Sequence, residues 1–189
     1  VPGLYDPGES FGKTRSDATH QWMVYDIDFE TGAIRWAREL EALVPTELKH
    51  VKNSFASETP VTDGRRVYVY FGCIGLVAAL NMSGETVWRT DVGSFNGGQE
   101  FGTAASPVLH DGRLYIVNDN TTGSFLAAFD ADTGAEIWRV ERDDTENWAT
   151  PFVWVNHIRT EIVTTGRRKI RSYDLHGNLL WELGGMTVN

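Results

Sequence analysis

The sequence contains a single cysteine, Cys73, among its 189 residues. One cysteine cannot form an internal disulfide, and no second cysteine stands at metal-ligand spacing. We therefore expect Cys73, within the apolar stretch YFGCIGLVA, to be a small buried strand residue. A reactive thiol is the alternative.

The sequence also lacks long apolar runs and an excess of positive charge. No segment approaches the roughly 18 apolar residues of a membrane span, and no signal peptide is present from which a localisation could be predicted. There are 17 Lys and Arg against 26 Asp and Glu, which gives a net charge of −9. Because this charge opposes phosphate binding, we predict no nucleic-acid partner.

Two further kinds of site have little support. The five histidines show no metal-ligand spacing, so no metal site is predicted. The glycine-rich stretch Gly93–Gly102 lacks the strand-to-helix context of a phosphate loop, which argues against a nucleotide site.

Tryptophan and glycine, by contrast, are plentiful, with 7 Trp and 19 Gly. Four tryptophans end similar segments, DFETGAIRW, LNMSGETVW, AFDADTGAEIW and YDLHGNLLW, at intervals of 52, 50 and 43 residues. Each has a glycine four residues earlier: the pairs are Gly32 and Trp36, Gly84 and Trp88, Gly134 and Trp138, and Gly177 and Trp181. A period of about 40–50 residues is typical of propeller blades.

A pair of short β-rich runs precedes three of these segments, and in two of the three an Asp-Gly pair lies between the runs. Asp63-Gly64 and Asp111-Gly112 each join two short β-rich runs, which is a strong hairpin signal because both residues tolerate positive φ. A third apolar run and the tryptophan-bearing fourth run follow, and four short antiparallel strands make a propeller blade. We predict an all-β propeller segment over 20–189, preceded by an irregular segment, 1–19. Its parts are a half blade at 20–40, with strands at about 20–28 and 33–38, and whole blades at about 57–90, 105–140 and 149–183.

The repeats number about three and a half, and the sequence shows no capping element. We therefore infer a fragment of a longer propeller of seven or eight blades. Open strand faces favour association, so two copies closing one ring is a further hypothesis.

The third segment resembles the pyrroloquinoline quinone (PQQ) type of β-propeller repeat, which also occurs in BamB-like outer membrane assembly factors. Its tryptophan-docking motif, AxDxxTGxExW, is matched by Ala128, Asp130, Thr133, Gly134, Glu136 and Trp138. The other three copies are degenerate. The resemblance covers nearly all of 20–183 and implies that each tryptophan packs against the adjacent blade, while Asp130 and Thr133 bond the local backbone. It also implies a periplasmic, extracellular or cell-envelope location.

Within this family, quinoprotein dehydrogenases use PQQ, a calcium ion and an aspartate base, and many add a disulfide between adjacent cysteines. This chain has no adjacent cysteine pair, and no segment aligns with their calcium or catalytic residues. We therefore predict no catalytic residue, cofactor or metal. PQQ with calcium is expected only if the chain is a fragment of a quinoprotein alcohol or sugar dehydrogenase.

The connections between blades differ from repeat to repeat, and in this family they lie on the face that usually binds ligands. Our predicted ligand-binding residues there are Asn53, Glu58, Gln99, Glu100, Arg142, Asp144 and Trp148. The alternative is that they only solvate the loops, with Trp148 covering a blade end. We predict a non-catalytic scaffold for a protein or small polar ligand. The dehydrogenase fragment is the second hypothesis, and a sensor or carbohydrate-binding propeller is the third.

Overall fold

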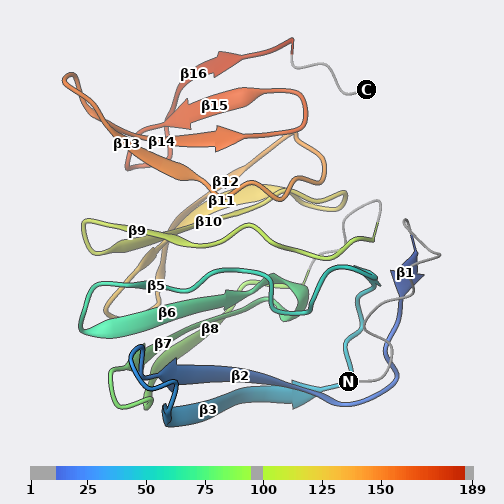
Figure 1. The fold of residues 1–189 in the computed structure, drawn as a ribbon. Helices are drawn as coiled ribbons and strands as arrows, with labels where there is room; N and C mark the ends of the chain where they lie inside the picture. The colour runs from blue at the N-terminus through green and yellow to red at the C-terminus, as the bar shows by residue number, and fades with distance from the viewer. Residues whose placement is uncertain (1–11, 95–99, 186–189) are drawn as a thin grey trace.

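The computed structural model describes residues 12–94 and 100–185, and it confirms an all-β propeller segment. Four antiparallel sheets are stacked one on the next from the N-terminal to the C-terminal end (Figure 1). The only helix in these two ranges is the 3₁₀ turn η1, Gly72–Ile74. No helix in the described part of the chain has the length and apolar character needed to cross a membrane.

The first sheet has two strands and the other three have four each. The first consists of β2 (His20–Ile27) and β3 (Ile34–Leu43). The second contains β5 (Val61–Thr62), β6 (Arg66–Phe71), β7 (Leu76–Asn81) and β8 (Thr86–Asp91). The third contains β9 (Val108–His110), β10 (Arg113–Asn118), β11 (Phe125–Asp130) and β12 (Glu136–Glu141). The fourth contains β13 (Phe152–Val155), β14 (Thr160–Thr165), β15 (Ile170–Tyr173) and β16 (Leu179–Leu183).

Two details differ from the strands expected in the half blade and before it. Strand β3 continues to Leu43, because its later residues keep pairing with the start of β2 as far as His20. The described part of 1–19 is also not wholly irregular. Strand β1 (Lys13–Thr14) pairs with β4 (Lys49–His50), a partner distant in sequence that local patterns could not indicate.

The core lies between the sheets, in three hydrophobic clusters at the three junctions. Strands β6, β7, β10 and β11 are apolar almost throughout, because each is covered by a sheet on both faces. Ala79 and Ala128 are fully buried and lie opposite Trp88 and Trp138 in register. Their small side chains leave room for the indoles.

Each of the first three repeat tryptophans donates its indole N–H to a backbone carbonyl in the turn of the next sheet. The bonds run from Trp36 to Met82, from Trp88 to Ala131 and from Trp138 to Leu175, each at 3.0 Å. The glycine of that next turn lies under the ring. A Cβ on Gly84 would stand 2.6 Å from Trp36, and one on Gly134 would stand 2.5 Å from Trp88. Glycine is required at these turns both for positive φ and for this close approach.

The turn residues have local partners. Asp130 Oδ1 accepts hydrogen bonds from Thr133 N and Thr133 Oγ1, both at 2.8 Å. The bond from the Thr133 side chain is the main reason why the pKa of Asp130 lies below its usual value. Asp28 makes the same bonds with Thr31, which lower the pKa of Asp28 to about 2. These carboxylates therefore stabilise turns.

Candidate functional site

Three inter-sheet connections converge on one surface depression. Phe101 is flanked by His50, whose ring lies edge-on with centroids 4.9 Å apart, and by Trp148, whose ring is stacked at 6.2 Å. Each aromatic residue comes from a different connection. With Lys52, Asn53 and Ala104 they line a shallow hollow of about 370 Å³, which we call the loop platform.

Hydrogen bonds from side chains to backbone carbonyls hold the loop platform together. The Trp148 indole N–H donates to the Gly102 carbonyl at 2.8 Å, and Asn53 Nδ2 donates to the Phe101 carbonyl at 2.8 Å. A Cβ on Gly102, which has φ +82, would stand 3.0 Å from Asn53 Nδ2, so the two loops approach closely there. Trp148 is still 38% exposed. A partly exposed indole on a fixed base can bind an apolar or planar group without much loss of side-chain entropy.

A small polar cavity lies behind the loop platform. Its volume is about 20 Å³, and its lining includes Tyr70, Asn118, Asn120 and Trp148. Asn118 Nδ2 donates to the Tyr70 hydroxyl at 2.8 Å, and Asn120 Nδ2 donates to Asn118 Oδ1 at 3.0 Å. A space of this size suits about one water molecule and is too small for an organic cofactor.

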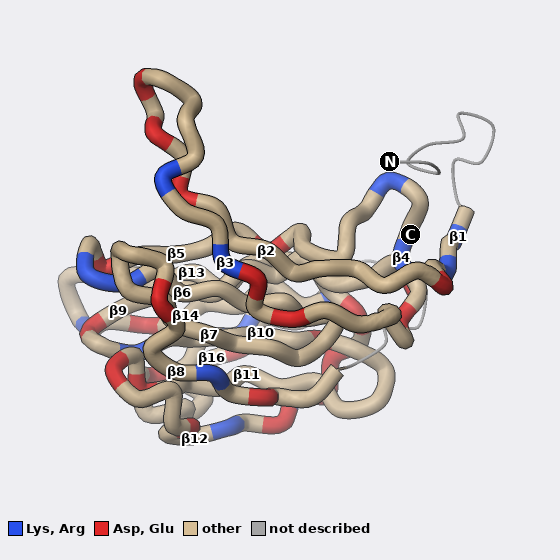
Figure 2. The backbone as a smooth tube through the Cα atoms, turned by 90° about the horizontal axis from the view of Figure 1, so that it is seen from below, with Lys and Arg blue, Asp and Glu red and all other residues tan. Residues whose placement is uncertain are grey.

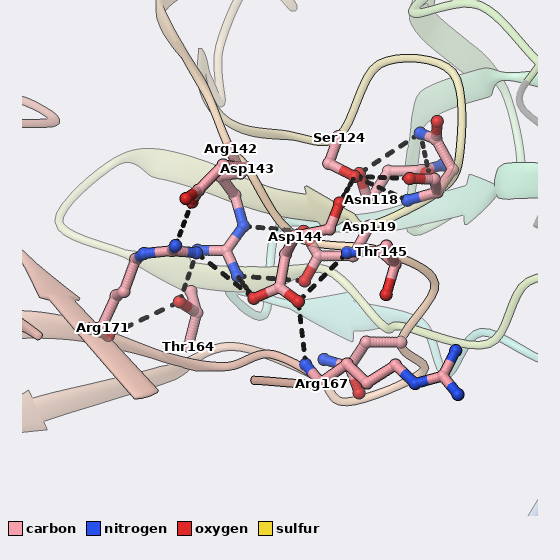
Figure 3. Close-up of polar contacts among 12 residues, drawn as sticks. Asn118, Asp119, Ser124, Arg142, Asp143, Asp144, Thr145, Thr164, Arg167 and Arg171 are labelled. Carbon is pink, nitrogen blue, oxygen red and sulfur yellow. Dashed lines mark hydrogen bonds and ion pairs between the residues drawn. The ribbon is translucent and has the colours of Figure 1, made fainter. Parts of the chain in front are cut away.

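Beside this cavity lies a buried ion-pair cluster, made of Asp119, Arg142, Asp144 and Arg171 (Figure 3). Arg142 bonds both carboxylate oxygens of Asp119, at 2.7 and 3.0 Å. Its remaining amino group donates to Thr164 Oγ1 at 2.7 Å and to the Tyr173 hydroxyl at 2.9 Å. The N–H groups of the Arg142 guanidinium thus donate to partners inside the protein, and these bonds join the third sheet to the fourth.

The two carboxylates of the cluster, Asp119 and Asp144, also have partners inside the protein. Asp144 accepts the backbone N–H of Arg167 at 2.9 Å and an Arg171 amino group at 3.2 Å. Burial raises the pKa of Asp119, although its bonds with Arg142 act in the opposite direction. The cluster is therefore an internal brace, since its charges compensate one another out of contact with solvent.

Glu58 lies in the interior too. One carboxylate oxygen accepts the backbone N–H of Gly72 at 3.1 Å, and the other has no hydrogen-bond partner among the residues that the structure describes. Burial raises the pKa of Glu58. A Cβ on Gly72 would stand 2.8 Å from this carboxylate, so the 3₁₀ turn is packed tightly against it.

The predicted ligand-binding residues therefore occupy different surroundings. Trp148 and Asn53 lie at the loop platform, whereas Glu58, Arg142 and Asp144 are buried. Glu100 forms a surface ion pair with Lys13 at 2.8 Å, and Gln99 lies outside the described residues. Their ligand contacts stay predictions.

Sequence reasoning missed Phe101 and the polar run Asn118–Asn120. Phe101 stands in the glycine-rich connection together with Phe95, and nothing in the sequence of that connection distinguishes it. The run at the end of β10 was detectable as three polar residues that follow an apolar strand.

The side chains that could ligate a metal ion bear on the hypothesis of a PQQ–calcium cofactor. In residues 12–94 and 100–185, no group of three or more His, Cys, Asp or Glu side chains is close enough to hold a metal ion. Asp119 and Asp144 are bound by arginines instead. The described residues thus do not fit a PQQ–calcium centre by themselves.

The acidic and basic residues are interspersed over the tube and do not gather into one basic face (Figure 2). This distribution agrees with the negative net charge of the sequence. It gives no support to an extended phosphate-binding surface.

The comparisons with known proteins point to one fold. The family model described as outer membrane protein assembly factor BamB matches residues 20–186. BamB from Moraxella catarrhalis is 21% identical, with a TM-score of 0.54 over 87% of this chain and 44% of that one. The quinohemoprotein alcohol dehydrogenase from Comamonas testosteroni is 16% identical, with a TM-score of 0.65 over 86% of this chain and 32% of that one.

A europium-containing methanol dehydrogenase is 12% identical, with a TM-score of 0.55 over 86% of this chain and 38% of that one. The chain thus spans less than half the length of each of these structures. No curated protein sequence matches it significantly. At these identities the structural likeness shows the fold alone.

Proposed function

Because this chain belongs to the family of the outer membrane protein assembly factor BamB, we propose that it is a non-catalytic PQQ-like propeller scaffold that binds a protein partner in the cell envelope. The observation that carries the proposal is the loop platform. Three separate connections bring Trp148, Phe101 and His50 together at the surface, while the charged residues behind them are paired internally. Aromatic residues on a fixed base are typical anchors of protein interfaces.

The test compares two exposed tryptophans. Trp148 lies on the loop platform, and Trp154 lies on β13, outside it, with 44% of its surface exposed. Overlapping peptides from outer membrane proteins are screened against the chain, and the tightest binder is titrated. We expect Trp148→Ala to weaken its binding about tenfold, and the control variant Trp154→Ala to leave it unchanged.

Equal weakening by both variants would contradict the proposal, as would the absence of any bound peptide. A parallel titration with oligosaccharides separates the third hypothesis. A carbohydrate-binding propeller would be stabilised against thermal unfolding by an oligosaccharide and not by the peptides, whereas the scaffold would be stabilised by its bound peptide.

The quinoprotein hypothesis has its own test. The likeness to the Comamonas testosteroni dehydrogenase, at a TM-score of 0.65, is the observation in its favour. Equilibrium dialysis of the chain with PQQ and calcium should show no retention, because the described residues offer no set of three acidic or histidine ligands. Calcium-dependent retention of PQQ would favour the dehydrogenase over the scaffold.

A further inference from the structure

Glu58 departs from the repeat pattern at the start of the second sheet. The residue before the Thr-Pro or Ser-Pro pair of each whole repeat is, in order, Glu58, Ala105 and Ala149. These positions are equivalent in the fold, because the Thr59 N–H donates to Ser106 Oγ at 2.8 Å and the Ser106 N–H donates to Thr150 Oγ1 at 3.0 Å. One repeat thus buries a carboxyl group where the other two have only a methyl group.

This carboxyl group contacts the connection that carries the loop platform. A Cβ on Gly72 would stand 2.7 Å from Thr103 Oγ1 and 2.8 Å from Glu58 Oε1, so the three residues converge at one point. Glu58 accepts the Gly72 N–H at 3.1 Å and also a hydrogen bond from the Thr103 side chain. Glu58 therefore joins the 3₁₀ turn η1 to the segment 101–103.

The segment joined to Glu58 is also the base of the loop platform. Its Gly102 carbonyl accepts the Trp148 indole N–H at 2.8 Å, and its Thr103 carbonyl accepts Asn53 Nδ2 at 3.4 Å. The same three residues thus bond Glu58 through a side chain and the loop platform through their carbonyls. A change at Glu58 therefore reaches Trp148 through one short segment.

The titratable groups that face Glu58 supply no positive charge. They are the Tyr70 hydroxyl of β6 and the Cys73 thiol of η1. Burial, and secondly the charge of Glu58, raise the pKa of both groups, so both stay protonated and neutral. The charge of Glu47 also acts on Cys73, and it is negative as well.

An ionised Glu58 is unfavourable in these surroundings. Asp119 and Asp144 have arginine partners, whereas one oxygen of Glu58 has no hydrogen-bond partner in the part of the chain that the structure describes. Burial accordingly raises the pKa of Glu58 above its ordinary value of 4.5. A bound proton therefore favours the closed arrangement, and loss of the proton favours an open one in which water reaches the carboxylate.

We propose that Glu58 is a proton-controlled clamp on the loop platform. With its proton bound, Glu58 holds the segment 101–103 against η1 and keeps the Gly102 carbonyl in place for the Trp148 indole. Loss of the proton releases this segment and loosens the loop platform, so the partner binds more tightly at acidic than at alkaline pH. The effect on partner binding rests on the proposed function, whereas the effect on the loop platform does not.

The test follows the loop platform of the whole chain as the pH changes. Amide hydrogen exchange is measured for residues 101–103, and the Trp148 indole signal is recorded in ¹H–¹⁵N spectra, in steps upward from pH 4.5. Rates are expressed as protection factors, which remove the intrinsic pH dependence of exchange. We expect protection of residues 101–103 to fall roughly tenfold as the pH rises, with that of β11 unchanged.

Three variants separate the clamp from other effects of pH. Glu58→Gln has the size of the protonated group and no charge, so its protection should stay high at every pH. Glu58→Ala gives this position the residue of the other two repeats and should lower protection at every pH. Glu30→Gln removes an exposed charge and should behave like the unchanged chain. Any pH dependence that His50 brings to the loop platform would persist in Glu58→Gln.

Two results would overturn the clamp. One is protection in the unchanged chain that does not fall as the pH rises, and the other is an equal fall in Glu58→Gln. Titration of the tightest-binding peptide at the same pH values separates the clamp from the proposed function. A pH-dependent loop platform that binds no peptide would refute the proposed function alone, and peptide binding through Trp148 with a pH-independent loop platform would refute the clamp alone.

Discussion

The junction between the third and fourth sheets differs from the outward face of the fourth sheet, although the same repeat motif builds both. At the junction, Trp138 and Arg113 both donate to the Leu175 carbonyl, at 3.0 and 2.7 Å. On the fourth sheet, Trp181 instead donates to Glu161 of its own sheet at 2.7 Å. The motif thus specifies the turn and the tryptophan, and the neighbouring residues decide where the indole bonds.

The residue at one strand position contributes to this difference, together with the absence of any sheet beyond the fourth in residues 12–94 and 100–185. Register places Glu161 in β14 where Arg66 and Arg113 stand in β6 and β10. Arginine donates forward to the next sheet, as Arg66 does to the Ala131 carbonyl at 3.1 Å. Glutamate can only accept, so it holds the Trp181 N–H within the sheet.

The largest expected effect comes from removing an indole at a junction. Trp88 is buried against the third sheet, whereas Trp181 is only partly buried on its own sheet. Trp88→Ala should lower the free energy of unfolding by about 3–5 kcal/mol, and Trp181→Ala by clearly less. Urea unfolding of both variants measures the difference, and equal losses would remove the distinction between junction and end.

The glycine under the indole gives a matched pair. Gly134 and Gly32 have similar positive φ, of 74° and 70°, but a Cβ on Gly134 would lie 2.5 Å from Trp88, while a Cβ on Gly32 would meet nothing within 4 Å. Both alanine variants share the backbone strain. Gly134→Ala should therefore cost an additional ~1–3 kcal/mol of overpacking. Thermal unfolding is the measurement, and identical melting temperatures would refute the close contact.

A smaller effect is expected from the arginine at the junction. Arg113→Met keeps the aliphatic length and removes the bond to the Leu175 carbonyl. Loss of a charged hydrogen bond should cost about 1–2 kcal/mol. The control is Arg168→Met, because Arg168 is exposed and outside the junction. Calorimetry of the two variants should show a loss only for Arg113→Met; equal effects would count against the forward bond.

The smallest expected effect is a change in how the stability of the fold depends on acidic pH. Hydrogen bonding, first from Ser172 and then from Trp181, lowers the pKa of Glu161 to about 2 from the ordinary glutamate value of 4.5. A carboxyl with a lowered folded-state pKa stabilises the fold above its unfolded value, and this stability is lost as pH falls toward the folded value. Glu161→Gln should therefore flatten the loss of stability between pH 4.5 and about pH 2.

Glu30→Gln, at an exposed turn position, controls for the loss of one negative charge. Urea midpoints across this pH range give the comparison. A curve for Glu161→Gln that is as steep as that of the unchanged chain would show that Trp181 does not rely on a charged Glu161.

Local features were predictable from the sequence. The Asp63-Gly64 and Asp111-Gly112 hairpins follow from residues that tolerate positive φ, and the structure has Asp111 at φ 48° and Gly64 at 82°. The order of four strands in each whole blade follows from short apolar runs between such turns.

Contacts between connections were not predictable in this way. Phe101 meets His50 and Trp148 only because three sheets set their connections side by side, and nothing in its own loop indicates this. Similarly, "ERDD" looks like a solvated charge run, yet Arg142 and Asp144 turn inward because Asp119 and Arg171 of neighbouring sheets provide opposite charges. Whether a charged loop residue is buried therefore depends on the partner side chains that the adjacent sheets provide.

In the proposed function, the repeat tryptophans build the sheet stack while Trp148 binds the partner. The chain has seven tryptophans, so its indole N–H signals form a small set in a ¹H–¹⁵N spectrum, assignable with single tryptophan variants. During titration with the tightest-binding peptide, we expect the Trp148 signal to shift while those of Trp36, Trp88 and Trp138 stay in place. Shifts at the three repeat tryptophans with an unmoved Trp148 signal would contradict the claim.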